Sequence, residues 1–166
     1  ALCEESGMQA DLKKRLLSEI VESKVTVFTN PTVSPTGFPF KTALLQDTIS
    51  EAEVYEKRKR ICDISLLRNV IKKEDGSIDY RCPAEPVEDY IRKSGQEEDT
   101  VGRTCLCNNL LSAAGFAQIR EDGYVEQPLV TAGDDLMSVK EFMKPGKTSY
   151  TATDVVTFLL GSTSRT

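Results

Sequence analysis

The sequence predicts a helix-rich α+β protein, and three observations support this class. Apolar residues recur with helical spacing in several segments, most clearly in residues 9–22. A β-branched and aromatic run at residues 25–29 is typical of a short strand. The chain has no internal repeat, heptad run or low-complexity tract, and its 166 residues are fewer than the roughly 250 of a complete TIM barrel.

The first elements are a helix, a strand and a broken loop. Leu12, Leu16 and Ile20 fall four residues apart and so share one face of the helix expected over residues 9–22. We expect the strand at residues 25–29 to complete half of an α/β repeat. Residues 30–39 contain too many prolines for regular structure, so they form either a binding loop with an apolar tip or a connector held by phenylalanines.

Two helices are expected in the middle of the chain. Ser50 and Glu53 have the spacing of a capping box, which predicts a helix from there to about Arg60. Residues 62–71 have a second helical pattern that ends at the turn of residues 72–76. The basic run at 57–60 is surrounded by carboxylates, which favours a solvated helix face over a phosphate-binding patch.

Four further segments have helical patterns with capping or turn signals at their ends: residues 87–93, 104–114, 132–143 and 155–160. Gly95 and Gly115 are placed to end the first and second of these helices. An apolar run at 129–131 leads into the third. The sequence TATD, ending at Asp154, is expected to cap the last helix.

The composition excludes several classes of function. The chain has no histidine, so it cannot alone build a Ser-His-Asp triad, a Cys-His pair or a His-ligated metal site. Its formal net charge of −5 argues against a nucleic-acid partner. No apolar stretch has the length of a membrane span, and we expect a soluble, cytoplasmic protein with no membrane partner.

The five cysteines are Cys3, Cys62, Cys82, Cys105 and Cys107. Their odd number and irregular spacing make a disulfide framework a poor interpretation and suit a reducing compartment. In one interpretation, Cys82, Cys105 and Cys107 form a thiol or metal site. In the other, these cysteines are packed thiols. The Cys-x-Cys spacing favours packed thiols over a zinc site, so no metal ligand is assigned.

Longer strings carry a more specific signal. In order along the chain these are SPTGFPFK (34–41), CD (62–63), YRCPAEP (80–86), EDTVGR (98–103), CLCN (105–108), PLVTAGDDL (128–136) and YTATDV (150–155). Together they resemble the C-terminal half of the 2-nitropropane dioxygenase family, also called nitronate monooxygenases. The similarity spans nearly the whole chain.

The resemblance implies a flavoenzyme whose FMN sits at the mouth of a TIM-like (β/α)8 barrel. Residues 1–45 then correspond to the end of the barrel and a connecting helix and strand. Residues 46–166 correspond to a helical substrate-side or lid domain with closing C-terminal helices. The barrel core and the general-base histidine belong to the missing N-terminal half, so no catalytic residue is assigned to this chain, which alone is expected to be inactive.

The family activity is oxidation of alkyl nitronates or nitroalkanes with O₂ to a carbonyl compound and nitrite. The implied partners are therefore the N-terminal barrel half, a small nitronate-like substrate and O₂, with a homodimer as a further possibility. Three alternatives stay open: a flavin-dependent enoyl reductase relative, a non-catalytic binding domain derived from the lid, and the cysteine-based thiol or metal site.

The resemblance also implies site residues. Flavin contacts are expected from Ala132, Gly133 and Asp134, and from Glu5 and Ser6 near the phosphate. A substrate pocket is expected from Thr36, Gly37, Phe38 and Lys41, with the lysine neutralising a nitronate or carboxylate. The structural alternatives are a helix cap at 132–134, core anchoring by Phe38 with a surface Lys41, and a chain-end role for Glu5 and Ser6.

Overall fold

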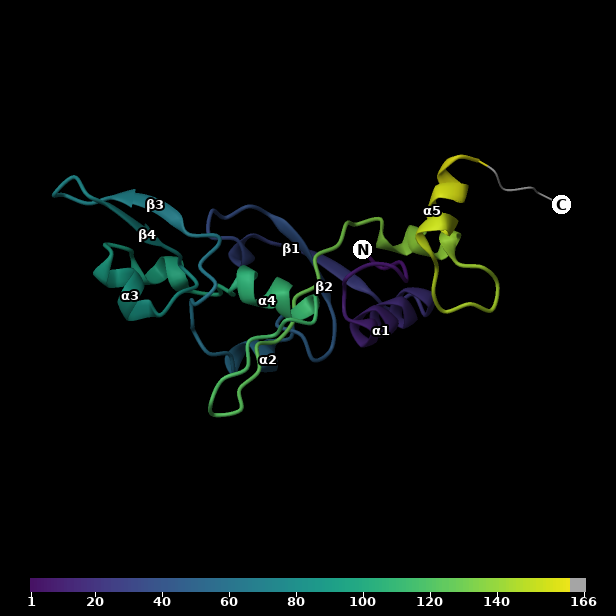
Figure 1. The fold of residues 1–166 in the computed structure, drawn as a ribbon, viewed down its shortest axis with the longest axis horizontal. Helices are drawn as coiled ribbons and strands as arrows, with labels where there is room; N and C mark the ends of the chain where they lie inside the picture. Colours follow the sequence, from purple (N-terminus) through teal and green to yellow (C-terminus); the bar gives the residue numbers. More distant parts are fainter. Residues whose placement is uncertain (162–166) are drawn as a thin grey trace.

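A computed structural model describes residues 1–161 as an elongated α+β arrangement (Figure 1). Its helices and strands are α1 (Ala10–Val21), β1 (Thr26–Asn30), β2 (Phe40–Leu44), α2 (Ala52–Glu56), β3 (Asn69–Lys72), β4 (Ile78–Arg81), α3 (Val87–Arg92), α4 (Leu106–Ala113) and α5 (Ala152–Leu159). Short 3₁₀ helices are η1 (Pro31–Val33), η2 (Glu97–Thr100) and η3 (Leu136–Phe142). Helices α1 and α5 lie toward one end, and the β3–β4 hairpin and α3 toward the other (Figure 1).

Helix α1 provides the centre of the main hydrophobic core. Leu12, Leu16 and Ile20, which were predicted to share a face, are each at most 1% exposed. They pack in one cluster with residues of β2, α4 and η3. Fully burying a leucine or isoleucine stabilises the fold by about 1.5–3 kcal/mol. The predicted helix at 9–22 is confirmed.

Strands β1 and β2 form an antiparallel hairpin that spans the middle of the molecule (Figure 1). The register pairs Thr26 with Leu44 and Asn30 with Phe40. The strand predicted at 25–29 is confirmed, but it pairs with β2 rather than entering a parallel α/β repeat. Residues 130–132 continue the sheet beyond β2: the Ala43 N–H donates to the Val130 carbonyl at 3.0 Å, and Thr42 bridges Thr131.

The helix predicted over residues 62–71 is wrong. Residues 61–68 lack regular structure, and residues 69–72 form strand β3, which pairs antiparallel with β4. Ser65 has a positive φ of 58°, which an α-helix does not accommodate. Leu66 is 73% exposed, so no core face exists to support a helix there. The β-branched Val70 and Ile71 instead suit a strand.

The capping box predicted at Ser50 and Glu53 is also wrong. The Ser50 hydroxyl accepts a hydrogen bond from the Leu45 N–H at 3.2 Å, and the residue preceding α2 is Glu51. Helix α2 ends at Glu56, four residues before the predicted end. Arg60 is therefore not on a helix face; its guanidinium donates to the backbone carbonyls of Pro83, Glu85 and Thr100.

Each helix predicted in the second half of the chain corresponds to a helix in the structure, and one of them is a 3₁₀ helix rather than an α-helix. Helices α3, α4 and α5 lie where predicted, whereas the segment predicted as a helix at 132–143 contains the 3₁₀ helix η3. Gly115 ends α4 with a φ of +88°, as expected for a residue that follows a helix. Gly95 has another role: a side chain there would collide with the Tyr90 ring, and Ser94 carries the positive φ of 61°.

The α+β class is thus confirmed, with helices and two antiparallel hairpins among residues 1–161. Within that part of the chain no parallel strand pair is formed, and the place of this chain in a TIM-like barrel stays a proposal. The division at residues 45 and 46 stays a prediction. No helix in residues 1–161 combines the length and apolar character needed to cross a membrane.

Candidate functional site

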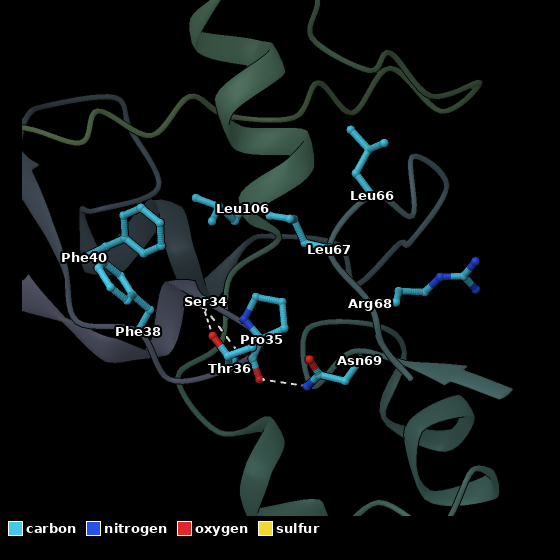
Figure 2. Close-up of a pocket in the computed structure, with 10 residues that line it drawn as sticks. All are labelled: Ser34, Pro35, Thr36, Phe38, Phe40, Leu66, Leu67, Arg68, Asn69 and Leu106. Atoms are coloured by element: carbon cyan, nitrogen blue, oxygen red, sulfur yellow. Dashed lines mark hydrogen bonds between the residues drawn. The ribbon is translucent and has the colours of Figure 1, made fainter. Parts of the chain in front are cut away.

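An apolar cavity of about 450 Å³ lies beside the loop that follows β1 (Figure 2). Its lining residues come from that loop, from β2, from residues 66–69 and from α4: Ser34, Pro35, Thr36, Phe38, Phe40, Leu66, Leu67, Arg68, Asn69 and Leu106. A cavity of this size and character suits a small organic molecule. Two residues of the predicted substrate pocket, Thr36 and Phe38, belong to its wall.

Local hydrogen bonds fix the loop that forms one wall. The Asn30 side chain accepts from the Thr32 N–H at 3.0 Å and so starts η1. Gly37 has a φ of +75°, which favours glycine, and its N–H donates to the Ser34 carbonyl at 3.1 Å. Arg103 donates to the same carbonyl at 2.6 Å. Gly37 therefore shapes the turn without lining the cavity.

Two aromatic rings give the cavity its apolar character, and one arginine borders it. Phe38 and Phe40 pack edge to face with centroids 5.0 Å apart, and Phe38 is 59% exposed. Arg68 also lines the cavity, and its guanidinium lies 5.3 Å from the Tyr80 ring centroid. Arg68 was not among the predicted site residues, because residues 62–71 were wrongly predicted as a helix.

Lys41 and Asp134 join the predicted substrate loop to the predicted flavin turn. The Lys41 ammonium lies 2.5 Å from the Asp134 carboxylate. The backbone adds a second link, because the Ala132 N–H donates to the Lys41 carbonyl at 3.0 Å. The structure thus brings the two predicted regions side by side. Lys41 faces Asp134 and is not among the residues of the apolar cavity.

The predicted flavin turn lines a different cavity, of about 360 Å³. Ala132 and Gly133 contribute to it together with Phe142 and Tyr150. Gly133 is exposed, and a side chain added there would meet only the Asp135 carboxylate within 3 Å. The backbone at Gly133 is therefore open to a flat ligand from outside.

Glu5 and Ser6 lie near the start of helix α5. The Glu5 carboxylate accepts from the Ala152 N–H at 2.9 Å, and this hydrogen bond lowers the pKa of Glu5. Ala152 is the first residue of α5, so Glu5 supplies a carboxylate at the positive end of that helix. The Ser6 hydroxyl is buried and has no hydrogen-bond partner among the described residues. A phosphate contact for these residues stays a prediction.

Four cysteines surround a third, much smaller cavity of about 10 Å³: Cys62, Cys82, Cys105 and Cys107. None of the five cysteines forms a disulfide. Within residues 1–161 no group of three or more His, Cys, Asp or Glu side chains is arranged to hold a metal ion. Hydrogen bonds from the Cys105 thiol and from the backbone N–H groups of Leu66 and Leu67 lower the pKa of Cys107 to about 6.

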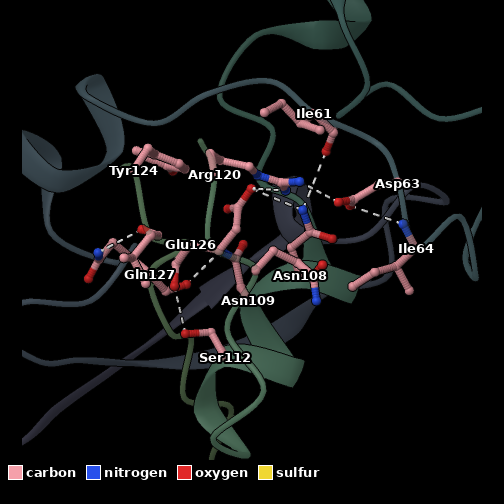
Figure 3. Close-up of polar contacts among 12 residues, drawn as sticks. Ile61, Asp63, Ile64, Asn108, Asn109, Ser112, Arg120, Tyr124, Glu126 and Gln127 are labelled. Atoms are coloured by element: carbon pink, nitrogen blue, oxygen red, sulfur yellow. Dashed lines mark hydrogen bonds and ion pairs between the residues drawn. The ribbon is translucent and has the colours of Figure 1, made fainter. Parts of the chain in front are cut away.

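A buried polar network beneath α4 was not predicted from the sequence (Figure 3). Glu126 is 3% exposed and accepts from Arg120 at 3.1 Å and from Asn108 at 3.0 Å. Arg120 also lies 2.5 Å from the Asp63 carboxylate. The Ser112 hydroxyl donates to the Glu126 carbonyl at 2.7 Å. Because every charge in this group has an opposite partner, the network holds three segments together rather than offering a reactive group.

Known proteins provide no independent guide to this arrangement. Comparisons with protein families, with curated proteins and with solved structures found no match to the chain. The functional assignment therefore depends on the geometry of these residues and on the resemblance carried by the sequence strings.

Proposed function

We propose that this chain is the substrate-side part of an FMN-dependent oxidoreductase that converts alkyl nitronates and O₂ to a carbonyl compound and nitrite. The observation that carries the proposal is the contact between the two regions expected to hold substrate and flavin. Lys41 and Asp134 form an ion pair, and the Ala132 N–H donates to the Lys41 carbonyl. Residues about 90 positions apart in the chain are thus in contact, which supports a substrate loop beside a flavin turn.

One feature of the 132–134 turn suits a flavin. Gly133 leaves its backbone open, so an aromatic ring system can approach it closely. Ser6 does not line the cavity at this turn, so a phosphate contact for its unpartnered hydroxyl stays a prediction. When bound, FMN would supply the capacity to accept electrons from the substrate and to pass them to O₂.

The apolar cavity suits the alkyl part of the substrate. Phe38, Phe40 and Leu106 offer apolar surface to a carbon chain. Arg68 borders the cavity, but its guanidinium extends away from the other lining side chains and lies over the Tyr80 ring (Figure 2). The charge-neutralising role therefore stays with Lys41, as the resemblance suggested.

The test uses the protein expressed with whatever sequence its gene encodes on either side of this chain. We expect bound flavin, seen by visible absorbance, and nitrite release from propyl-2-nitronate. Nitrite release distinguishes this activity from that of an enoyl reductase, which would instead consume NAD(P)H with an unsaturated thioester. Absence of both flavin and nitrite would contradict the proposal and favour a non-catalytic binding domain.

Gly133→Val tests the flavin turn. A branched side chain would block backbone approach, so flavin affinity should fall by about tenfold, equivalent to about 1.4 kcal/mol of binding free energy, and flavin content should fall with it. Because the new side chain meets only an exposed carboxylate, Tm should stay within about 2 °C of wild type. Wild-type flavin content in Gly133→Val would remove this turn from the site.

A further inference from the structure

A polar cavity of about 710 Å³ lies between the β3–β4 hairpin and the C-terminal end of α3, which stand side by side in Figure 1. Five of the residues that line it are basic, namely Lys72, Lys73, Arg81, Arg92 and Lys93. Two are acidic, in a chain whose formal net charge is −5. The cavity therefore concentrates positive charge in a protein that is acidic as a whole.

Three of the five cations are compensated by a neighbouring carboxylate. The ion pairs, with N–O distances between 2.6 and 2.9 Å, are Lys73–Asp79, Arg92–Asp89 and Lys93–Glu85. Within residues 1–161, Lys72 and Arg81 have no carboxylate at ion-pair distance. The uncompensated positive charge of the cavity therefore belongs to these two residues.

Arg81 is the cation that the fold holds in place. Its Nη1 donates to the Lys93 carbonyl at 2.9 Å, and its guanidinium lies 5.2 Å from the Tyr90 ring centroid. A guanidinium has five N–H donors, and Arg81 makes no other hydrogen bond in the described part of the chain. The remaining donors are not buried. A planar fork that is already oriented loses little freedom when it binds a ligand.

The two acidic lining residues lie at the far end of the hairpin. The register pairs Arg81 with Asn69 at its base, three residues before the pair that closes the turn. At about 3.4 Å per strand residue, roughly 10 Å separate these pairs, which exceeds the Debye length of about 8 Å at physiological salt. Glu74 and Asp75 lie in the turn, where Asp75 accepts from the Ser77 N–H at 2.9 Å. Neither carboxylate therefore opposes an anion beside Arg81 at close range.

We propose that Arg81 binds an oxyanion group, a phosphate or a carboxylate, of a small organic molecule that occupies this cavity. A planar guanidinium matches two oxygens of either group. The cavity is larger than a lone ion requires and falls within the range of small-molecule sites, about 300–1,000 Å³. Arg92 adds a second cation, since its side chain is 71% exposed and such surface ion pairs contribute little. The inference uses neither flavin nor nitronate and does not depend on the proposed function.

Calorimetric titration with inorganic pyrophosphate and, separately, with citrate tests the site. The protein is expressed with whatever sequence its gene encodes on either side of this chain, and the buffer contains no divalent metal. We expect saturable binding of at least one probe. Binding of pyrophosphate alone would identify a phosphate ligand, binding of citrate alone a carboxylate ligand, and binding of both the shared oxyanion chemistry.

Two arginines of similar environment provide a matched pair of variants. Arg81→Gln should weaken probe binding by about tenfold or more, because the charge-assisted hydrogen bonds are lost. Arg68→Gln is the control, since Arg68 lies 5.3 Å from the Tyr80 ring centroid on the same hairpin but does not line this cavity. It removes the same charge, so affinity should stay within about twofold of wild type.

Arg81→Lys separates recognition from folding. It keeps the positive charge and a donor for the Lys93 carbonyl but lacks the planar fork, so its affinity should lie between those of wild type and Arg81→Gln. Hydrogen exchange of the wild-type protein locates the probe without any variant. A ligand held between the hairpin and α3 should slow exchange of β3 and β4 amides by about threefold or more and leave α1 unchanged.

Three results would overturn the inference. Neither probe could bind the wild-type protein. Arg81→Gln and Arg68→Gln could weaken binding equally, which would indicate diffuse attraction to positive charge. The bound probe could protect segments other than the hairpin and α3. If Arg81→Gln failed to unfold cooperatively, the affinity of Arg81→Lys and the wild-type exchange pattern would decide.

Discussion

At the scale of single residues, the buried carboxylates show how this chain tolerates charge inside the protein. Glu126 is 3% exposed, yet it is held by Arg120 and Asn108. A buried ion pair contributes little net stability, but removing one partner leaves an uncompensated charge, which costs about 3–5 kcal/mol. Arg120 also holds Asp63, so a single guanidinium compensates carboxylates from two segments.

Asp63→Asn should reveal this arrangement as a pH dependence of stability. The hydrogen bond from Arg120 lowers the pKa of Asp63 below its ordinary value of 3.8. Because the pKa of Asp63 is lower in the folded than in the unfolded protein, its ionised carboxylate stabilises the fold above pH 3.8. This stabilisation is lost as the pH falls through the lower pKa of the folded state. The difference in Tm between wild type and Asp63→Asn should therefore be constant near neutral pH and shrink below about pH 4. Thermal unfolding followed by circular dichroism checks this.

Glu121→Gln is the control for that experiment, because Glu121 is an exposed carboxylate next to Arg120 in the sequence. Its Tm should follow the wild-type curve at every pH. A Tm difference for Asp63→Asn that stayed the same from pH 7 to pH 3 would show that the Asp63–Arg120 pair does not stabilise the fold through charge.

At the scale of elements, helix α5 depends on its first turn, because none of its residues is buried. Thr151 accepts from the Asp154 N–H at 3.1 Å, and the Asp154 carboxylate accepts from the Thr151 N–H at 2.9 Å. The side chain of Lys144 and the Thr151 hydrogen bonds together lower the pKa of Asp154 to about 2. The cap that the sequence predicts from TATD is confirmed, and it takes the form of a capping box.

Thr151→Ala should loosen α5 without affecting the main core. Loss of a capping side chain costs about 1 kcal/mol, which corresponds to roughly a fivefold faster exchange of the α5 amides. Hydrogen exchange measured by mass spectrometry on peptides covering 152–160 provides the readout. Thr153→Ala, at an exposed position inside the same helix, is the matched control and should leave exchange nearly unchanged. Equal exchange in the two variants would show that the cap does not limit opening.

Elements with local signals could be predicted, whereas elements that depend on distant partners could not. Helices α1, α4 and α5 carry their periodicity within their own sequence, and α5 also carries its capping box. Strands β2, β3 and β4 were missed because a strand is defined by pairing, and their partners set the register. The apolar residues 62–71 satisfied a helical period, but no buried surface lies beside them.

The candidate site shows the same division. The prolines and apolar tip of the loop left a binding loop and a connector open, and the resemblance implied Thr36 and Phe38 as pocket residues; both line the apolar cavity. The position of Arg68 at the cavity was not predicted, because it depends on the irregular stretch before β3. The pairing of Lys41 with Asp134 could not be predicted, since it depends on residues 130–132 joining the edge of β2.

At the scale of the whole molecule, burial differs between the end with α1 and the end with the β3–β4 hairpin, which lie apart along the long axis (Figure 1). The main core gathers around α1 and β2, and a smaller cluster of four buried residues includes Val33 and Leu106. The β3–β4 hairpin has no buried residue, and a two-stranded hairpin alone is only marginally stable in water. The two ends of the protein should therefore differ in local stability.

Native-state hydrogen exchange should show this difference. Amides of β3 and β4 should exchange at least about tenfold faster than those of β1, β2 and α1, because opening the hairpin exposes little apolar surface. Leu16→Ala, which removes a fully buried side chain, should speed exchange in α1 and β2 together. Equal protection of the two hairpins would indicate that the whole chain opens as one cooperative unit.

The ion pair between Lys41 and Asp134 makes the link between loop and turn responsive to ionic strength. Its side chains are 41% and 66% exposed, and such an exposed pair weakens as added salt shortens the Debye length from about 8 Å at physiological ionic strength to about 3 Å at 1 M. The adjoining backbone hydrogen bond is not weakened in this way. Raising the salt concentration thus frees the Lys41 ammonium while the strand contact persists, whereas in dilute buffer an incoming anion must first displace Asp134.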